Sequence, residues 1–486
     1  MAIRDYAAAK GGMLIFLRRF FRENIGSVIV INLLLAAVAF AKDLLFAIYF
    51  GTTATADAFG LSFFIVDTLA NGLIGSALAV ACVPQFSKLL AVGEHGRLNR
   101  SFRKVAVAVG LGSVVVALLL GAAGRLITAW SGPGLSTGSS ATAWKLLWLL
   151  LPIVVIMPVN AVLTSILQVW GKFNVPALGP VLFNFILLVV VGAAYGFGLP
   201  QAEGVYVFSV AIVLASMAML ACTGVGWLRY QAAAGKTRNA RKPDASASRP
   251  IAERGDLGEI FRAFSLYLFI LASTQSVLFF ERYLASELGT GTIAGLTYAY
   301  RISQFPIWVF VAAVAAVALP SLSKWVAMNA WDRLLKQLRV TLLYILGITV
   351  PTAFVFYFFR EPLIEMLFLR GSFDQSSLAV TSSLLAGYAL TIVGQGVSAI
   401  LLRYYLALGK MGAPLLIYCI AAAVNIGLDV IFVRQFGAIG LGYGAACGWG
   451  ITAALLLIHL LMTLRSLDTK RGAPSHEKML NHHTRL

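Results

Sequence analysis

Charged residues are scarce in this sequence. They make up 12% of the 486 residues, while hydrophobic residues make up 59%; an ordinary soluble domain has about 25% charged residues. A chain with so few charges cannot cover a water-exposed surface, so most of it must lie in lipid. The composition therefore excludes a soluble enzyme.

Groups that carry redox, metal or nucleotide chemistry are also few. The five histidines are scattered, and Gly235-Lys236-Thr237 lacks the earlier glycine of a phosphate loop, because position 230 is tyrosine. We predict no cofactor, no metal site, no catalytic residue and hence no enzyme activity. The four cysteines lie in apolar stretches and are interpreted as small hydrophobic residues: Cys82, Cys222, Cys419 and Cys447.

Long apolar runs are abundant instead. Twelve stretches are long enough to cross a hydrocarbon core of about 30 Å, and helices are expected because the backbone groups of a span must be satisfied within it. The predicted spans are 26–50, 58–83, 105–124, 146–169, 176–196, 204–228, 263–287, 292–319, 340–359, 379–408, 413–433 and 438–464.

The positive charges are concentrated in the segments that lie on one side of the membrane. With the N-terminus inside, the inside segments hold 29 of the 38 lysines and arginines, and the outside loops hold five. The positive-inside rule then puts both termini in the cytoplasm. The expected location is the inner membrane of a bacterium. The net charge of +18 is thereby accounted for by topology, and nucleic acid is not an expected partner. Residues 1–25 are basic and amphipathic without a small-residue cleavage site, so we expect them to be retained.

The two halves of the chain repeat each other. A shift of 236 positions maps Pro84 to Lys88 onto Pro320 to Lys324, and a shift of 238 maps Gly171-Lys172 onto Gly409-Lys410 and Asp43 onto Glu281. Since each half has six spans, the repeat is parallel, and substrate sites of such transporters lie between the two halves.

The predicted fold is therefore an all-α polytopic membrane protein with about 12 transmembrane helices in two six-helix lobes around a central cavity. The expected domains follow from the spans and from the basic segment between them: a cytoplasmic amphipathic segment 1–25, an N-lobe 26–228, a basic cytoplasmic linker 229–262, a C-lobe 263–464 and a cytoplasmic tail 465–486.

Several charged residues fall inside the predicted spans, where they are costly and usually face a cavity or a partner. Neighbours on a helix point about 100° apart, so we expect the partners of Lys42–Asp43 and Glu281–Arg282 to lie elsewhere. Structural pairing within the bundle is the alternative to a hydrated cavity, and for Asp57 helix capping is the simpler one. The candidates are Lys42, Arg282 and Arg301 for substrate binding, and Asp43, Asp57, Asp67 and Glu281 as cavity acids or ion-coupling groups.

Cations at mid-membrane depth favour an anionic substrate. Arginine and lysine give charge-assisted hydrogen bonds to phosphate, so Lys42, Arg282 and Arg301 suit a diphosphate headgroup. A cationic drug would need an acidic cavity without them. Because no nucleotide motif is present, transport is expected to draw on a coupling ion (Na⁺ or H⁺), on the membrane potential or on substrate consumption.

A set of motifs, in order along residues 40–450, resembles the MurJ/MviN flippases of the multidrug/oligosaccharidyl-lipid/polysaccharide (MOP) exporter superfamily. The segments that carry the resemblance are Phe40-Ala-Lys42-Asp43, Phe50-Gly51, Asp57-Ala-Phe59, Tyr298 to Pro306, Phe368 to Phe373 and Tyr405 to Gly409.

The resemblance implies two six-helix lobes that alternate access to a cationic cavity. It also implies a polyprenyl-diphosphate peptidoglycan precursor, lipid II, as substrate. By position, Lys42 stands for the arginine of the family's Arg-Asp pair, Asp43 for its aspartate, and Asp57 and Arg301 match family residues. The sequence departs from the family at Ala36, where a further arginine is frequent, and in having twelve spans where well-studied members have two more helices.

Four functions remain open from the sequence. The first is a lipid II flippase of peptidoglycan biosynthesis. The second is a flippase for another polyprenyl-diphosphate oligosaccharide, of exopolysaccharide or teichoic type. Cation-coupled multidrug efflux is disfavoured by Lys42, Arg282 and Arg301. A membrane scaffold for a cell-wall assembly complex predicts that neutralising Arg301 leaves function intact, whereas a flippase should lose it. Expected partners are the lipid-linked substrate and membrane lipids, with cell-wall synthesis proteins as further candidates.

Overall fold

The structure is a computed structural model. It describes residues 25–239, 255–311 and 330–472, together with 314, 315, 318, 322, 325, 326 and 328. Most of the predicted segment 1–25, the middle of the basic linker, the repeat motif at Pro320, Ser323 and Lys324, and the end of the tail lie outside the described residues.

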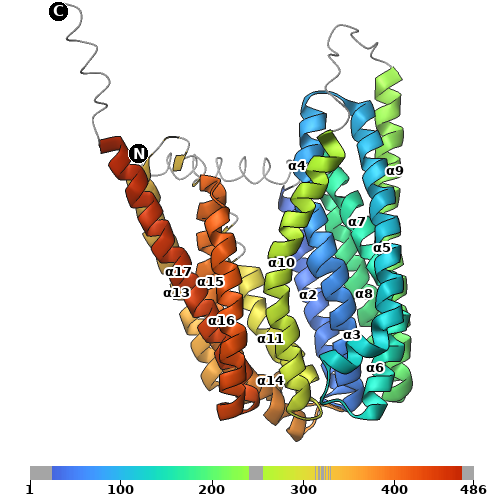
Figure 1. Cartoon of the computed structure of the whole chain (residues 1–486). Coiled ribbons are helices and arrows are strands. Elements are labelled where there is room, and N and C mark those ends of the chain that lie inside the picture. The colour runs from blue at the N-terminus through green and yellow to red at the C-terminus, as the bar shows by residue number, and fades with distance from the viewer. Residues whose placement is uncertain are drawn as a thin grey trace, which may run out of the picture. The chain divides into compact units, whose positions relative to one another are not determined.

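The described residues are almost entirely helical, which confirms the all-α prediction (Figure 1). Among the described residues, eleven helical segments are long and apolar enough to cross a membrane. The predicted span 292–319 is helical through Val311, beyond which only some residues are described. The elements are α2 (Ile25–Phe50), α3 (Ala54–Asp67), η1 (Thr68–Gly75), α4 (Ser76–Ala91), α5 (His95–Ser131), α6 (Thr137–Leu150), α7 (Pro152–Val169), α8 (Asn174–Gly196), α9 (Gln201–Asn239), α10 (Gly255–Glu287), α11 (Thr292–Pro306), η2 (Ile307–Val311), α13 (Trp331–Phe358), α14 (Arg360–Phe368), α15 (Gln375–Leu408), α16 (Gly412–Phe436) and α17 (Ala438–Gly472).

Two predicted spans differ in detail from the observed helices. The predicted span 146–169 is interrupted after α6, where Pro152 begins α7. Leu151 between the two helices keeps helical angles, but Pro152 has no backbone N–H to continue the hydrogen-bond ladder. The predicted span 58–83 is continuous, but it contains the wide π-helical turns of η1 between α3 and α4.

The chain forms two compact units. The main part of unit 1 ends at Gln275, and unit 1 also takes in Gly289–Ala294 and Phe368–Asp374. Within it, α8 lies between α2 and α9, and α7 packs against α4, α5 and α9 (Figure 1). One of its hydrophobic clusters is rich in aromatic rings and includes Phe86, Phe102 and Trp227.

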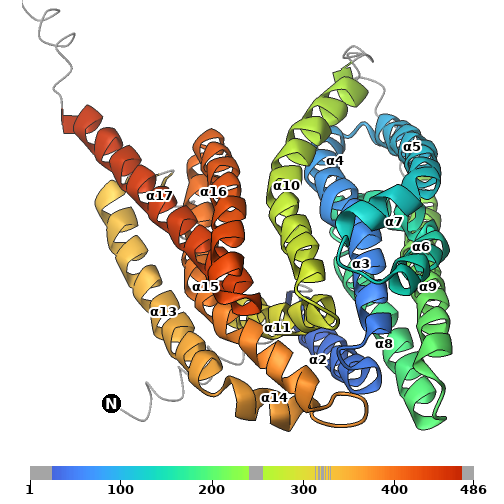
Figure 2. The same cartoon turned by 60° about the horizontal axis from the view of Figure 1, so that its bottom comes forward.

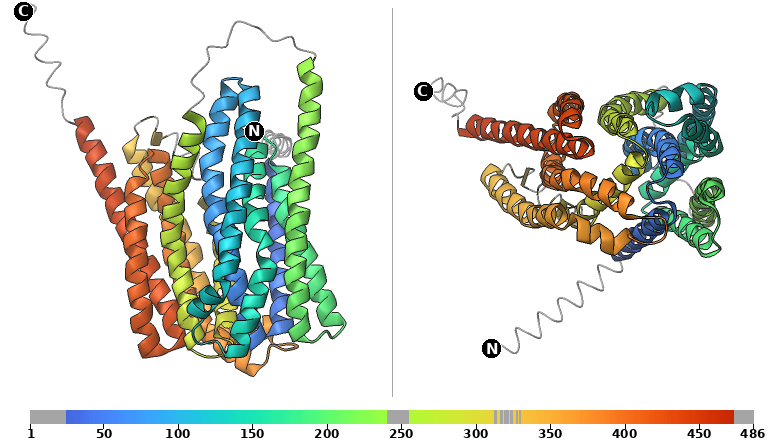
Figure 3. Two further views of the ribbon diagram at one scale, coloured as in Figure 1. Left: turned by 45° about the vertical axis from the view of Figure 1, so that its right-hand side comes forward. Right: turned by 90° about the horizontal axis from the view of Figure 1, so that it is seen from below.

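Unit 2 is organised around α15. This helix packs against α13 on one side and α17 on another, and α16 packs on α17 (Figures 2 and 3). Glycines permit a close crossing of α15 and α17: a Cβ atom built on Gly442 of α17 would lie 2.5 Å from Gly387 of α15. The glycines of Gly440-Leu-Gly442-Tyr-Gly444 therefore serve close helix packing.

The internal repeat is visible in local geometry. Gly171 and Gly409, which are 238 positions apart, both end a helix in the left-handed region, with φ of 70° and 68°. In both halves the following lysine donates its backbone N–H to a carbonyl five residues earlier: Lys172 to Leu167 and Lys410 to Tyr405.

The two π-helical segments are also related by a shift of 238 positions. Moving η1 by 238 positions gives residues 306–313, which contain η2. In η2 the cause is visible in the sequence, since Pro306 directly precedes it and proline disrupts the regular helix ladder. The parallel repeat thus extends from sequence motifs to backbone irregularities.

Candidate functional site

The seven predicted site residues fall into two groups. Unit 1 contains Lys42, Asp43, Asp57 and Asp67, and unit 2 contains Glu281, Arg282 and Arg301. Each group is described within its own unit.

The two charges of α2 pair with each other. The Nζ atom of Lys42 lies 2.7 Å from Oδ1 of Asp43, and both side chains are largely shielded from solvent. Our prediction that these neighbours make poor mutual partners was wrong. The four flexible carbons of lysine carry its ammonium back to the adjacent carboxylate, and a poorly solvated environment strengthens the attraction.

Asp57 is a buried helix cap. Its carboxylate accepts the backbone N–H of Gly291 and, at 2.8 Å, that of Ala294, at the start of α11. Thr53 caps Asp57's own helix, since its hydroxyl accepts the N–H of Ala56. Capping was the simpler interpretation of Asp57, and the structure shows that the helix it caps begins more than 230 residues later in the chain.

Asp67 ends α3 just before the wide turns of η1. Its Oδ1 atom accepts a hydrogen bond from the amide of Asn71 at 2.6 Å. A neighbouring glycine allows another helix to approach closely, because a Cβ atom on Gly72 would lie 2.9 Å from the amide of Gln275 in α10.

Glu281 in unit 2 has a partner on a different helix, as predicted. The hydroxyl of Tyr388 on α15 donates to Oε2 of Glu281 at 2.6 Å, and both residues are at most 2% exposed. That distance is typical of a hydrogen bond to an ionised oxygen.

Arg282 is buried next to this pair. Its Nη1 atom donates to the carbonyl of Leu278 at 3.0 Å. It also interacts electrostatically with Glu281 and with Arg301, which brings the three predicted residues of unit 2 into one charged cluster.

Sequence reasoning missed a further member of this cluster. Asp429 on α16 is fully buried, and its charge acts on Glu281 and Tyr388. The Asn425 amide, in the orientation that satisfies its hydrogen bonds, donates to Oδ1 of Asp429 at 3.2 Å. Gly444 of α17 faces this aspartate and leaves it room. A carboxylate within the predicted span 413–433 was the available signal.

The unit 2 cluster thus combines buried carboxylates with two guanidinium groups. Glu281, Arg282 and Asp429 lie in helices that are long and apolar enough to cross a membrane, and Arg301 lies on α11. Such a cluster can bind an anion through the arginines and a small cation or proton through the carboxylates.

A family model described as "Lipid II flippase MurJ" matches residues 46–475. The chain belongs to the MurJ family. The predicted resemblance is thereby confirmed over most of the sequence.

Curated members of the MurJ family align with much of the chain. The "Probable lipid II flippase MurJ" of Thermotoga maritima is 25% identical over 412 residues, which are 84% of this chain and 79% of that protein. The "Lipid II flippase MurJ" of Burkholderia cenocepacia is 24% identical over 88% of this chain and 81% of that protein. A relative from Bdellovibrio bacteriovorus is 27% identical over a shorter alignment, 62% of this chain and 54% of that protein.

Solved structures support the fold. A lipid II flippase MurJ in an inward closed conformation has a TM-score of 0.73 at 21% identity and covers 91% of this chain and 90% of that one. An inward-facing multidrug resistance MATE transporter of the MOP superfamily has a TM-score of 0.72 at 16% identity, covering 90% and 95%. The MOP exporter fold predicted from the sequence is confirmed, and the chain is a multi-pass membrane protein.

Proposed function

We propose that this protein is a flippase that moves lipid II, a polyprenyl-diphosphate-linked peptidoglycan precursor, from the cytoplasmic to the outer leaflet of the bacterial inner membrane. The match to the MurJ family over residues 46–475 carries the proposal. It is supported by curated relatives whose names state that activity.

The charge distribution supports an anionic substrate. Lys42 and Arg282 lie in helices that are long and apolar enough to cross a membrane, and Arg301 is close enough to Arg282 to interact with it electrostatically. In our proposal they bind the diphosphate through charge-assisted hydrogen bonds while the lobes 26–228 and 263–464 alternate access. When no substrate is bound, the carboxylate of Asp43 then neutralises the Lys42 ammonium in place of the phosphate.

Coupling is assigned in the same proposal to the acids of unit 2. Glu281 and Asp429 repel each other electrostatically, so uptake of one H⁺ or Na⁺ between two buried carboxylates relieves that repulsion. A cation that enters with each cycle would supply the driving force. Both termini are proposed to lie in the cytoplasm, as the distribution of lysine and arginine favours.

The test uses cells whose own lipid II flippase can be switched off, with this protein as the sole replacement. We expect growth and continued access of an externally added lipid II-cleaving toxin to its target. No toxin-accessible lipid II, with the protein present in the membrane, would refute lipid II as substrate and favour another polyprenyl-diphosphate oligosaccharide.

Variants of the proposed binding residues can be compared in the same assay. Arg301→Ala, at normal abundance, is expected to abolish toxin-accessible lipid II, because the substrate diphosphate loses a cationic donor. The exposed Lys145→Ala is the matched control, since it also removes a positive charge. Equal activity of the two variants would refute the assignment of Arg301.

A further inference from the structure

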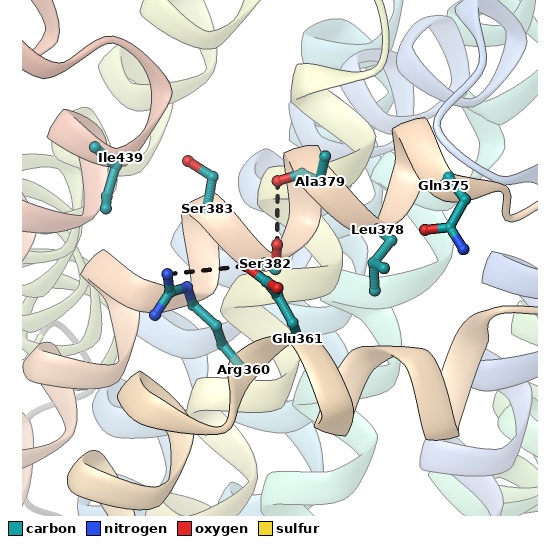
Figure 4. A pocket seen from close by; sticks show the side chains of 8 residues that line it. All are labelled: Arg360, Glu361, Gln375, Leu378, Ala379, Ser382, Ser383 and Ile439. Atoms are coloured by element: carbon teal, nitrogen blue, oxygen red, sulfur yellow. Dashed lines mark hydrogen bonds and ion pairs between the residues drawn. The ribbon is translucent and has the colours of Figure 1, made fainter.

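A pocket of about 370 Å³ lies at the end of unit 2 where α13 gives way to α14 (Figure 4). Pockets of this size hold small ligands or headgroups. Its lining comes from α14, the first turns of α15 and the start of α17: Arg360, Glu361, Gln375, Leu378, Ala379, Ser382, Ser383 and Ile439.

The polar lining offers opposite charges side by side. The Nη2 atom of Arg360 lies 3.9 Å from Oε1 of Glu361, a separation that leaves both groups able to bind a ligand, and both side chains are partly exposed. Ser382 donates its hydroxyl proton to the carbonyl of Ala379, so its oxygen is left as an acceptor toward the pocket.

Arg360 is held in place by its neighbour Tyr357. Its Nη1 atom donates to the Tyr357 carbonyl at 2.8 Å, and the guanidinium lies 5.8 Å from the centre of the Tyr357 ring. The Tyr357 hydroxyl is in turn 3.4 Å from that of Tyr443 on α17. Because a guanidinium has five N–H donors, this arrangement fixes its position and leaves donors for an anion.

The surroundings of the pocket are those of a membrane interface. The membrane-crossing segment Trp331–Phe358 ends at this point. Phe358, Phe359 and Met366 expose 60%, 55% and 63% of their surfaces beside it. Large apolar side chains at the end of a span lie at the level of the lipid headgroups and upper acyl chains.

We propose that this pocket binds the zwitterionic headgroup of a phospholipid with a primary ammonium, of the phosphatidylethanolamine type. Arg360 binds the phosphate, and the ammonium donates to Glu361 and Ser382. The acyl chains lie along the exposed apolar side chains outside the pocket. A phosphatidylcholine headgroup has the same charges but no N–H groups, so it cannot make the second set of hydrogen bonds.

The test is native mass spectrometry of the purified full-length chain, titrated with phosphatidylethanolamine, phosphatidylcholine and phosphatidylglycerol that carry identical acyl chains. The wild type is expected to bind phosphatidylethanolamine roughly tenfold more tightly than the other two, the effect of one charge-assisted hydrogen bond. Equal affinity for phosphatidylethanolamine and phosphatidylcholine would overturn the proposal.

Variants test separately the residue proposed to bind the phosphate and the residue proposed to bind the ammonium. Glu361→Gln should remove the preference for the primary ammonium, and Arg360→Gln should weaken all three lipids. Glu365→Gln, on the exposed face of the same helix and outside the pocket, is the control and should behave as wild type. If Glu361→Gln and Glu365→Gln give the same preference for phosphatidylethanolamine over phosphatidylcholine, the pocket does not recognise the ammonium.

Soluble phosphoethanolamine distinguishes a lipid from a free headgroup. Because the acyl chains contribute apolar contacts, millimolar phosphoethanolamine should leave the bound lipid in place. Displacement at the concentration of the lipid itself would mean that the pocket takes a free metabolite, which would overturn the assignment to a membrane lipid. Transport of the substrate does not enter any of these measurements, so they stand apart from the proposed function.

Discussion

The hydrogen bond between Tyr388 and Glu281 gives the sharpest test of the buried cluster in unit 2. Tyr388→Phe removes one oxygen from a fully enclosed site and leaves the ring, so no large cavity forms. The carboxylate of Glu281 then loses its 2.6 Å donor without changing its surroundings otherwise.

The expected loss in the free energy of unfolding follows from two typical values. Hydrogen bonds to charged groups contribute about 1.5–3 kcal/mol in proteins, whereas hydrogen bonds between membrane helices average about 0.6 kcal/mol, because the unfolded chain in lipid also finds partners. Since the hydrogen bond here is short and buried, we expect a loss of about 1.5 kcal/mol, close to a tenfold change in the unfolding equilibrium constant.

The assay is reversible unfolding in mixed micelles with increasing dodecyl sulfate, applied to wild type, Tyr388→Phe, Glu281→Gln and the double variant. The cycle isolates the interaction from the separate effects of each change. A coupling energy of about 1.5 kcal/mol is expected. A coupling below about 0.5 kcal/mol would refute the charge-assisted bond, since additive changes within that margin are typical of residues that do not interact.

Three further predictions concern backbone positions. Asp57→Ala should accelerate amide exchange at the start of α11 about tenfold, because two N–H groups lose their acceptor; unchanged exchange would contradict the cap. Gly171→Ala and Gly409→Ala should each cost about 1 kcal/mol in dodecyl sulfate unfolding, since both adopt positive φ in open space; unequal costs would argue against equivalent turns. Gly442→Val should prevent recovery of folded protein, whereas Gly450→Ala, which faces open space, should not; normal yield of the valine variant would contradict the tight crossing.

The spans and the repeat could be predicted because they depend on local composition. Apolar length fixes which segments enter lipid, and duplicated turns leave matching residues such as Gly171 and Gly409. The interruption before Pro152 was missed because the apolar run continues across it.

Side-chain partners were harder to predict. The Lys42–Asp43 pair depends on a flexible side chain that helix geometry alone does not constrain. The partner of Asp57 lies on a helix more than 230 residues away, a distance over which sequence spacing carries no information. Asp429 could have been found, because it is a charged residue inside a predicted span, as all the other candidates except Asp57 are.

The two π-helical segments have a consequence for the history of the chain. η1 and η2 occupy equivalent positions in the two halves, as expected if the irregularity was present before a duplication joined them. An ancestor of this kind would be a six-helix protein with the irregularity in its second span. Because an even number of spans gives both copies the same orientation, that ancestor would have assembled as a parallel homodimer before fusion.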